Sequence, residues 1–306
     1  FPKWGGDEVC SHTTNADKAK IFCGDAALIG VPCKCQMRGY GDYKYPRDKG
    51  LPGSSHGYKP GGNGGGAVSI EVVGTMELNG KITVRGLDGG TGTSQNPDGL
   101  GGGAGGSVLI MTGTFKGNGE IMANGGNGGI QIDINQKNDG GGGGGGRVSV
   151  HYTKNEYIGI YDVSGGYSYV HSCQYDIKYL ELGLHIDSRC RPNSKPSKLN
   201  NVYNNIHGGS TWPNGGGSPG SLYTEDSNLG TTSMTFDNYG KVSDYPTYFS
   251  NPFQLNTTLT SFYMKRNASI SLHPENVAAG AKSALDVSKF EAPQGCIFRI
   301  GKNAVL

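Results

Sequence analysis

Few residues in this chain carry side chains suited to catalysis, and the most suggestive group spans residues 185–191. On a β-strand His185 and Asp187 would share one face, with Arg189 and Arg191 close behind. A histidine beside a carboxylate can transfer a proton, which is the chemistry of a polysaccharide-cleaving enzyme. No second carboxylate can be placed beside Asp187, so we interpret this segment as a solvated strand end. We predict no catalytic residue and no enzymatic activity.

Cysteines are the second group with chemical potential, and all seven are disulfide candidates: Cys10, Cys23, Cys33, Cys35, Cys173, Cys190 and Cys296. The spacing of Cys33 and Cys35 is wrong for a zinc knuckle, and His12 completes no ligand set, so we predict no metal site. Disulfides indicate an oxidising compartment and therefore a secreted protein. We expect at least two disulfides within residues 1–60, and an odd total leaves one thiol buried, free or joined to another chain.

Two sequons, at Asn256 and Asn267, are candidates for N-glycosylation in a secreted protein. The chain also has 17 tyrosines, which could stack on the rings of glycans, although packing between strands is the more common role of tyrosine.

Composition limits the class of protein. Glycine makes up 55 of 306 residues, about 18 %, against an average near 7 %. A helical enzyme is therefore unfavourable, and a glycine-tolerant β architecture is favoured. The net charge of +2 gives no signal for nucleic acid, and no apolar run is long enough to span a membrane. The glycine runs match a phosphate-binding pattern trivially, without a strand–loop–helix unit, so we predict no cofactor.

An internal repeat of about forty residues gives the strongest structural signal. Three glycine tracts each lead into an apolar segment, and these segments are 67–86, 107–126 and 147–166. The first two align forty residues apart through Val68 and Val108, then thirty-nine apart after a one-residue gap, where Ile82 meets Ile121. The third segment keeps the frame, with Val148 forty residues after Val108. A repeat whose units cannot bury an apolar face alone predicts a solenoid.

Apolar residues alternate within the repeats, which indicates β-strands. We expect equivalent strands to stack in parallel, with an antiparallel β-sandwich as the alternative. The pairs Asn79–Gly80 and Asn118–Gly119 are compatible with either a hairpin or the corner of a coil. The glycine tracts are either flexible loops or extended polyproline-II segments that pack closely because no Cβ separates their backbones.

The sequence GGSVLIMTGTFKGNGEIMANGGNGG, followed by GGGGGGGRVSVHY, resembles the glycine-rich repeat of large secreted and cell-surface proteins of protists, bacteria and plants. GSPGSLYTEDSNLGTTSMTFDNYG is similar to a motif that commonly follows that repeat. The resemblance covers roughly residues 61–166 and 215–240. It implies a right-handed parallel β-helix outside the cell, and it supplies no catalytic residues.

We therefore expect three parts. Residues 1–60 depart from the repeat and are predicted to form a disulfide-tied N-terminal cap. Residues 61–190 would form the glycine-rich solenoid. Residues 191–306 would continue the solenoid or form a second β domain.

The predicted function is structural: an extracellular subunit of a fibre, hair-like surface appendage or coat, assembled head to tail. A solenoid end exposes an unpaired strand, and an uncapped end can join another subunit. The chain ends on apolar residues, so we expect it either to continue past Leu306 or to dock there on another chain. The candidate interface residues are Ile297, Phe298, Ile300, Val305 and Leu306. A glycan-binding adhesin is the alternative, and a polysaccharide-acting β-helix enzyme is the third possibility.

Overall fold

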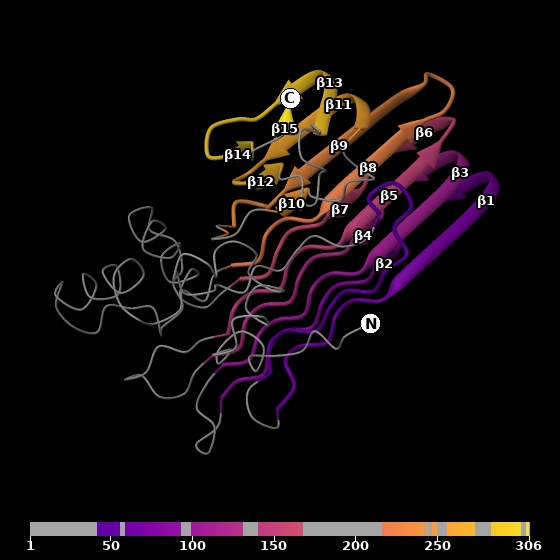
Figure 1. Ribbon diagram of the computed structural model, residues 1–306. Coiled ribbons are helices and arrows are strands. Elements are labelled where there is room, and N and C mark those ends of the chain that lie inside the picture. Colours follow the sequence, from indigo (N-terminus) through magenta and orange to yellow (C-terminus); the bar gives the residue numbers. More distant parts are fainter. Residues whose placement is uncertain are drawn as a thin grey trace, which may run out of the picture.

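A computed structural model describes residues 42–55, 59–92, 99–130, 140–167, 216–241, 243, 247–249, 256–272, 283–300 and 304–305. Every regular element in these ranges is a β-strand, and the strands of the main sheet lie side by side in chain order (Figure 1). Among these residues there is no helix long and apolar enough to cross a membrane.

Within the described ranges the strands form one large sheet and two small ones. The large, nine-stranded sheet contains β1 (Ala67–Glu77), β3 (Ser107–Gly117), β5 (Arg147–Tyr152), β8 (Ser221–Asp226), β9 (Thr231–Asp237), β11 (Asn256–Lys265), β13 (Ser283–Glu291) and β15 (Ala304–Val305), with β6 (Lys154–Tyr157) paired to β3. One small sheet contains β2 (Lys81–Thr83), β4 (Glu120–Met122) and β7 (Ile160–Asp162), and the other contains β10 (Thr247–Phe249), β12 (Ser269–Leu272) and β14 (Ile297–Ile300).

The predicted register of the repeats is confirmed. Val68 pairs with Val108, and Val108 pairs with Val148, all in parallel strands. The one-residue gap in the alignment is a register shift between Val72 and Thr75, beyond which the pairing continues thirty-nine residues apart. The repeats therefore pair in parallel, not as the antiparallel hairpins of the alternative prediction.

The Asn–Gly pairs are corners rather than hairpin turns. Asn79–Gly80 lies between β1 and β2, and these two strands belong to different sheets. The Asn79 side chain also contacts the next repeat, because its Oδ1 accepts the N–H of Asn118 at 3.3 Å. Each repeat thus turns out of the large sheet at the same place.

Strand direction reverses once in the large sheet, between β8 and β9. These two strands pair antiparallel, with Leu222 opposite Thr235. The Asp226 carboxylate accepts the N–H groups of Asn228 and Leu229 in the intervening turn. Because β9, β11, β13 and β15 are parallel to one another, the C-terminal strands run opposite to β1, β3, β5 and β8.

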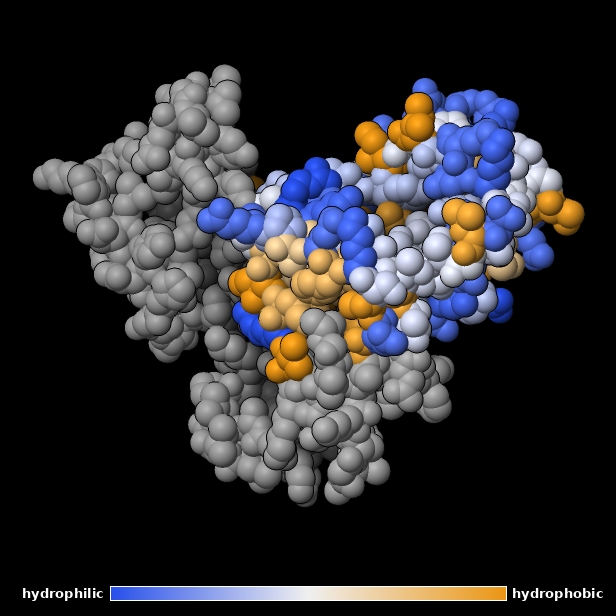
Figure 2. Space-filling model, turned by 90° about the horizontal axis from the view of Figure 1, so that it is seen from above, coloured by the Kyte–Doolittle hydropathy of each residue, from blue (hydrophilic) through white to orange (hydrophobic). Residues whose placement is uncertain are grey.

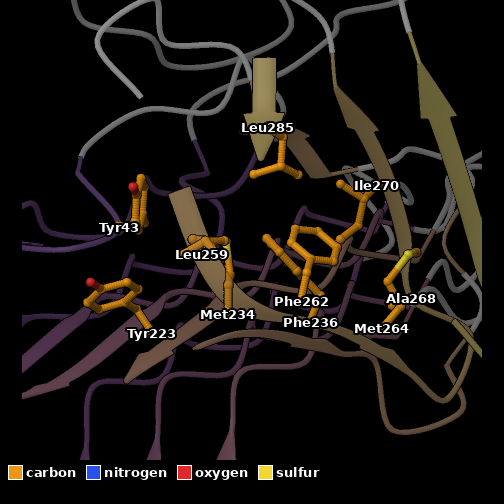
Figure 3. Close-up of a cluster of buried hydrophobic side chains, with 10 residues drawn as sticks. All are labelled: Tyr43, Tyr223, Met234, Phe236, Leu259, Phe262, Met264, Ala268, Ile270 and Leu285. Atoms are coloured by element: carbon orange, nitrogen blue, oxygen red, sulfur yellow. The ribbon is translucent and has the colours of Figure 1, made fainter. Parts of the chain in front are cut away.

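Two hydrophobic cores lie on opposite faces of this one sheet. Neighbouring residues of a strand point to opposite faces, and on β8 Leu222 packs against the first core while Tyr223 belongs to the second. The first core lies under the repeats and contains Val84, Val108, Ile110, Phe115, Ile121, Ala123, Val148, Val150, Tyr157 and Val163. The second, shown in Figure 3, contains Tyr43, Tyr223, Met234, Phe236, Leu259, Phe262, Met264, Ala268, Ile270 and Leu285.

The glycine tracts form a hydrogen-bonded bundle of extended segments, as the polyproline-II interpretation predicts. Residues 101–106 show the pattern, since their N–H groups donate in turn to three neighbouring segments. Gly101 and Ala104 donate to Ser54 and Leu51, Gly102 and Gly105 to Gly141 and Gly144, and Gly103 and Gly106 to Leu87 and Val84. A neighbour that recurs every third residue matches the three residues per turn of polyproline II.

Close approach of backbones explains why these positions are glycine. A Cβ on Gly105 would lie 1.8 Å from the carbonyl oxygen of Ala123. Neither Gly105 nor any other described tract glycine has a left-handed φ, so conformation is not the reason. At Gly144 the nearest atom to a Cβ would be the Ser218 Oγ at 3.7 Å, an ordinary contact. Glycine is therefore required at some tract positions and replaceable at others.

Candidate functional site: sheet ends and a polar strap

The first end of the large sheet is β1, and its core-facing side chains are only partly covered. None of its eleven residues is buried. Val68 and Ile70 pack on the first core but remain partly exposed, whereas their neighbours Val108 and Ile110 on β3 are fully buried. Another strand placed beside β1 would therefore bury apolar surface and bond to backbone groups.

Toward the other end of the large sheet, the rings in a column of aromatic side chains also become more exposed. Phe236 and Phe262 are 1 % exposed, and the next ring outward, Phe290 on β13, is 37 % exposed. Phe262 stacks on Phe290 with ring centres 5.5 Å apart, and Phe298 packs edge-on against Phe290 at 5.3 Å. The column thus ends on an incompletely covered ring.

Three of the predicted interface residues lie on β14, the outermost described strand of its small sheet. Ile297 is 47 % and Ile300 51 % exposed, while Phe298 is half-buried against the second core. Val305 belongs to β15, which pairs with β13, and its side chain and all of Leu306 lie outside what the structure describes. Figure 2 looks from above Figure 1 and shows hydrophobic residues in one larger orange and pale-orange patch as well as in separate groups among hydrophilic ones.

The C-terminal strands have a repeat of twenty-eight residues that sequence reasoning missed. Ser233 pairs with Ser261, and Asn256 with Ala284. The corner position recurs at the same interval: Tyr239, Asn267 and Gly295 have φ of 51°, 64° and 92°. The only obvious signal in the sequence was the shared Thr–Ser pair at residues 232–233 and 260–261.

The two sequons occupy different settings. Asn256 begins β11, and nothing is described of its side chain. Asn267 lies at the recurring corner, where its Nδ2 donates to the Gly240 carbonyl oxygen at 2.8 Å. Ser269 of the same sequon is 3 % exposed, and its Oγ accepts a bond from Arg299. The Asn267 side-chain amide, to which a glycan would be attached, is therefore already hydrogen-bonded within the corner.

Among the predicted cysteines only Cys296 is described. It is half-buried beside the second core, and burial raises the pKa of its thiol. The other six cysteines lie outside the described residues, as do His185, Asp187, Arg189 and Arg191. Within the described ranges, no three His, Cys, Asp or Glu side chains are grouped as metal ligands.

Residues 42–48, which we call the strap, cross the face of the sheet that carries Tyr223. At one end Tyr43 packs edge-on against Tyr223, with ring centres 5.4 Å apart. At the other end the carbonyl oxygen of Asp48 accepts the Ser107 hydroxyl at 2.6 Å. The strap thus passes from β8 over β5 to β3, beside the second core.

A polar network fixes the middle of the strap. Glu225 on β8 accepts bonds at Oε2 from Lys44 Nζ at 2.8 Å and from the Tyr223 hydroxyl at 2.9 Å, and His151 Nδ1 lies 3.2 Å from the same oxygen. The other ring nitrogen, His151 Nε2, lies 2.9 Å from the Lys44 carbonyl oxygen and 3.0 Å from Ser149 Oγ. The Tyr45 ring stacks on His151 with ring centres 5.0 Å apart.

The charges of the network reinforce one another. Burial alone would raise the pKa of Glu225, but the bonds from Lys44 and Tyr223 outweigh it, and the pKa is lowered. Burial alone would lower the pKa of Lys44, but the bond and charge of Glu225 raise it overall. Burial and the Glu225 bond raise the pKa of Tyr223. Glu225 is therefore held as a carboxylate and Lys44 as an ammonium.

Ser149, His151 and Glu225 are arranged like a nucleophile, a base and an orienting carboxylate. Ser149 is fully buried, however, and its hydroxyl donates to the Lys44 carbonyl oxygen at 2.6 Å. The Ser149 hydroxyl thus bonds to the strap, whereas the hydroxyl of a nucleophilic serine would face a substrate. Sequence reasoning missed the network because it joins residues more than one hundred positions apart.

An open groove lies along the glycine bundle, lined by Asp88, Gly89, Thr91, Asn127, Gly128, Gly129, Ile130 and Tyr167. Side chains of successive repeats form a ladder there. Asp88 Oδ1 accepts the N–H of Asn127 at 2.8 Å, and Asn127 Oδ1 accepts the N–H of Tyr167 at 2.9 Å. The Tyr167 ring also contacts the Lys241 ammonium, 4.7 Å from the ring centre.

Comparison with protein-family models, with curated proteins and with solved structures found no match to this chain.

Proposed function

We propose that this protein is a structural subunit of an extracellular fibre, hair-like appendage or coat, built by joining β-solenoids end to end. The observation that carries the proposal is the partial exposure of core columns at both described ends of one sheet, at Val68 and at Phe290. Partly exposed apolar columns beside unpaired strand edges are surfaces on which another subunit can pair. Seven cysteines and two sequons support placement outside the cell.

The solenoid proposed is the right-handed parallel β-helix that the resemblance to glycine-rich repeat proteins implies. Parallel crossover connections are right-handed in nearly all proteins. Between β8 and β9 the strand direction reverses and the core changes face together. The hand of a coil depends on the direction of its strands and on the face of the sheet that carries the core. Because both reverse between β8 and β9, the two halves of the proposed solenoid have the same hand.

Head-to-tail joining would place β15, and the part of β13 that β15 does not pair with, beside β1 of the next subunit. If the next subunit has the same orientation, the opposite directions of these strands make the contact antiparallel, like the pairing of β8 with β9. Such a heterologous contact generates a filament when the rotation between subunits does not close a ring.

Replacement of Ile297 and Ile300 by Asp tests the proposal. Both side chains are about half exposed, so the fold should tolerate the changes, whereas Phe298 packs on the core and is left intact. Leu229→Asp is the control, because Leu229 is 69 % exposed on the β8–β9 turn, away from either end. We expect the parent and control chains to sediment as assemblies and to show fibres by electron microscopy, and the double variant to sediment as a monomer. A parent chain that stays monomeric, or a double variant that assembles normally, would contradict the proposal.

Glycan binding is the second candidate, favoured by the groove that contains Tyr167. An aromatic ring can pack against the apolar face of a sugar, and the neighbouring carboxylate and amide groups can bond to its hydroxyl groups. Tyr167→Ala should then abolish binding of the chain to immobilised glycans while assembly is unchanged. If neither the parent chain nor the variant binds any glycan, this candidate is excluded.

A further inference from the structure

The corner between β1 and β2 contains an asparagine followed by a glycine, Asn79–Gly80, and this pair of residues can lose ammonia spontaneously. The backbone nitrogen after an asparagine attacks the side-chain carbonyl carbon, and glycine favours the attack because it has no Cβ to block the approach. The reaction needs a backbone nitrogen that is not held in a hydrogen bond and a side chain that solvent reaches. Asn79 and Gly80 are both exposed.

The Gly80 nitrogen meets the first condition because β2 is the outermost strand of its small sheet (Figure 1). Its N–H donates to no residue in the described part of the chain, and a Cβ at this position would find nothing within 4 Å. The Gly80 carbonyl oxygen accepts the N–H of Glu120 at 2.9 Å. Gly80 is therefore bonded to the next repeat through its carbonyl group alone.

The equivalent pair in the second repeat, Asn118–Gly119, is held more firmly. The Gly119 N–H donates to the Leu78 carbonyl oxygen at 2.8 Å, and Gly119 is buried whereas Gly80 is exposed. Attack on the Asn118 side chain would first have to break this hydrogen bond and move a buried stretch of backbone. The same two residue types thus occur at equivalent corners with different freedom.

The other described Asn–Gly pairs lie in the glycine bundle, where the backbone is also held. Gly125 and Gly128 donate their N–H groups to the next repeat at 2.9 and 2.8 Å. Gly64 donates to no described residue, but Gly62 and Gly65 on either side of it both donate to the second repeat. Among the described pairs, Asn79–Gly80 therefore combines an unbonded glycine N–H with a corner outside the bundle.

The surroundings of the Asn79 side chain also favour the reaction. Its Oδ1 accepts the N–H of Asn118 at 3.3 Å, and this oxygen gains negative charge when the carbonyl carbon is attacked. In the third repeat the corresponding N–H, that of Ile158, donates to the Gly117 carbonyl oxygen instead of to Asn118. The backbone donor present at Asn79 is thus not repeated at Asn118.

We propose that Asn79 is a site of spontaneous deamidation, at which the folded chain converts to an aspartyl or isoaspartyl form while Asn118 stays intact. The Gly80 nitrogen loses its proton to hydroxide and bonds to the side-chain carbonyl carbon of Asn79. The bond from that carbon to Nδ2 breaks, and Nδ2 takes up a proton and leaves as ammonia. Water then opens the resulting succinimide ring at either carbonyl, which gives aspartate or isoaspartate.

The product changes the corner in two ways. The Asn79 Nδ2 donates to Glu77 Oε1 at 2.8 Å, and its replacement by oxygen puts a second negative charge beside Glu77. The isoaspartyl form also adds one carbon to the main chain between β1 and β2. The reaction takes place within one subunit and does not depend on the proposed assembly.

Mass spectrometry of the intact chain aged at pH 8, at a concentration where it is monomeric, tests the proposal. Fragment spectra of its peptides locate each modified residue. We expect Asn79 to deamidate roughly tenfold or more faster than Asn118, which is the factor that one protecting hydrogen bond can supply. In urea the two residues should react at similar rates, because both precede glycine, and Asn79 in the folded chain should keep a rate close to that in urea.

Gly80→Ala is the matched variant, since its Cβ has open space and the backbone of Gly80 has no left-handed φ. It should slow the deamidation of Asn79, leave the rate at Asn118 as in the parent and leave the unfolding midpoint unchanged. Two results would overturn the proposal: equal rates at Asn79 and Asn118 in the folded chain, or an Asn79 that reacts in urea but stays intact when the chain is folded.

Discussion

The guanidinium group of Arg266 forms an ion pair with the Asp237 carboxylate and also lies over the ring of Tyr239. Its Nε lies 2.9 Å from Asp237 Oδ1, and its Cζ lies 3.6 Å from the centre of the Tyr239 ring. The Tyr239 hydroxyl in turn donates to the Tyr161 carbonyl oxygen at 2.9 Å. This corner therefore connects the twenty-eight-residue strands to the last glycine-rich repeat.

Replacing Arg266 should lower the free energy of unfolding more than the loss of a surface ion pair does, because Asp237 is only 8 % exposed. We expect Arg266→Ala to lower the free energy of unfolding by about 2 kcal/mol, since it leaves a nearly buried carboxylate without its charged partner. Lys154→Ala, which breaks the exposed pair with Glu156, is the control and should leave the unfolding midpoint unchanged. Equal midpoints for the two variants in a urea titration would argue against this account.

The glycine bundle predicts opposite outcomes for two neighbouring substitutions. Gly105→Ala places a methyl group 1.8 Å from a carbonyl oxygen, and we expect it to lower the free energy of unfolding by about 3 kcal/mol or more. Gly144→Ala finds room at 3.7 Å and should be neutral, or stabilising by up to about 1 kcal/mol. Thermal unfolding of both variants measures the contrast, and similar melting temperatures would count against close packing of the bundle.

The column of phenylalanines predicts a gradient of stability from core to edge. Phe262→Ala should cost about 3–5 kcal/mol, because the ring is 1 % exposed among other aromatic rings. Phe290→Ala should cost clearly less in the isolated chain, since its ring is 37 % exposed. Chemical unfolding at a concentration where the chain is monomeric compares the two. A cost at Phe290 as large as that at Phe262 would mean that the outer ring is fully buried in solution.

Alkaline pH should weaken the first core through Tyr157. Burial raises the pKa of this tyrosine to about 12, and its hydroxyl donates to the Gly119 carbonyl oxygen at 2.7 Å. The folded state thus prefers the neutral phenol, and this stabilisation is complete below pH 10 and is lost as the pH rises toward 12. Unfolding midpoints measured from pH 9 upward should fall less steeply for Tyr157→Phe than for the parent chain. Parallel slopes would exclude this tyrosine as the cause.

The sequence predicted the parallel register because the same apolar columns recur in each repeat, as at Val68, Val108 and Val148. It did not predict the reversal at β8–β9, where the turn over residues 227–230 lacks the two-residue Asn–Gly signature of a tight hairpin. The second repeat escaped notice because its corner is Tyr239 in one unit and Gly295 in another. In both, the backbone conformation is shared and the residue type is not.

Contacts between distant segments that are not equivalent parts of a repeat could not be predicted from the sequence. The Ser149–Lys44 bond joins residues 105 positions apart and belongs to no periodic pattern. Ile297 and Ile300 were predicted as residues of an assembly interface, but their place on a three-stranded side sheet was not predicted.

The threefold bonding of the glycine segments has a mechanical consequence. A β-strand is bonded to neighbours on two sides only, so a sheet bends easily about an axis along its strands and resists tension across its hydrogen bonds. Residues 101–106 are tied to neighbours in three directions around their axis. A lateral load along any of these three directions therefore stretches hydrogen bonds, so this segment should resist bending more evenly than a β-strand of the sheet does.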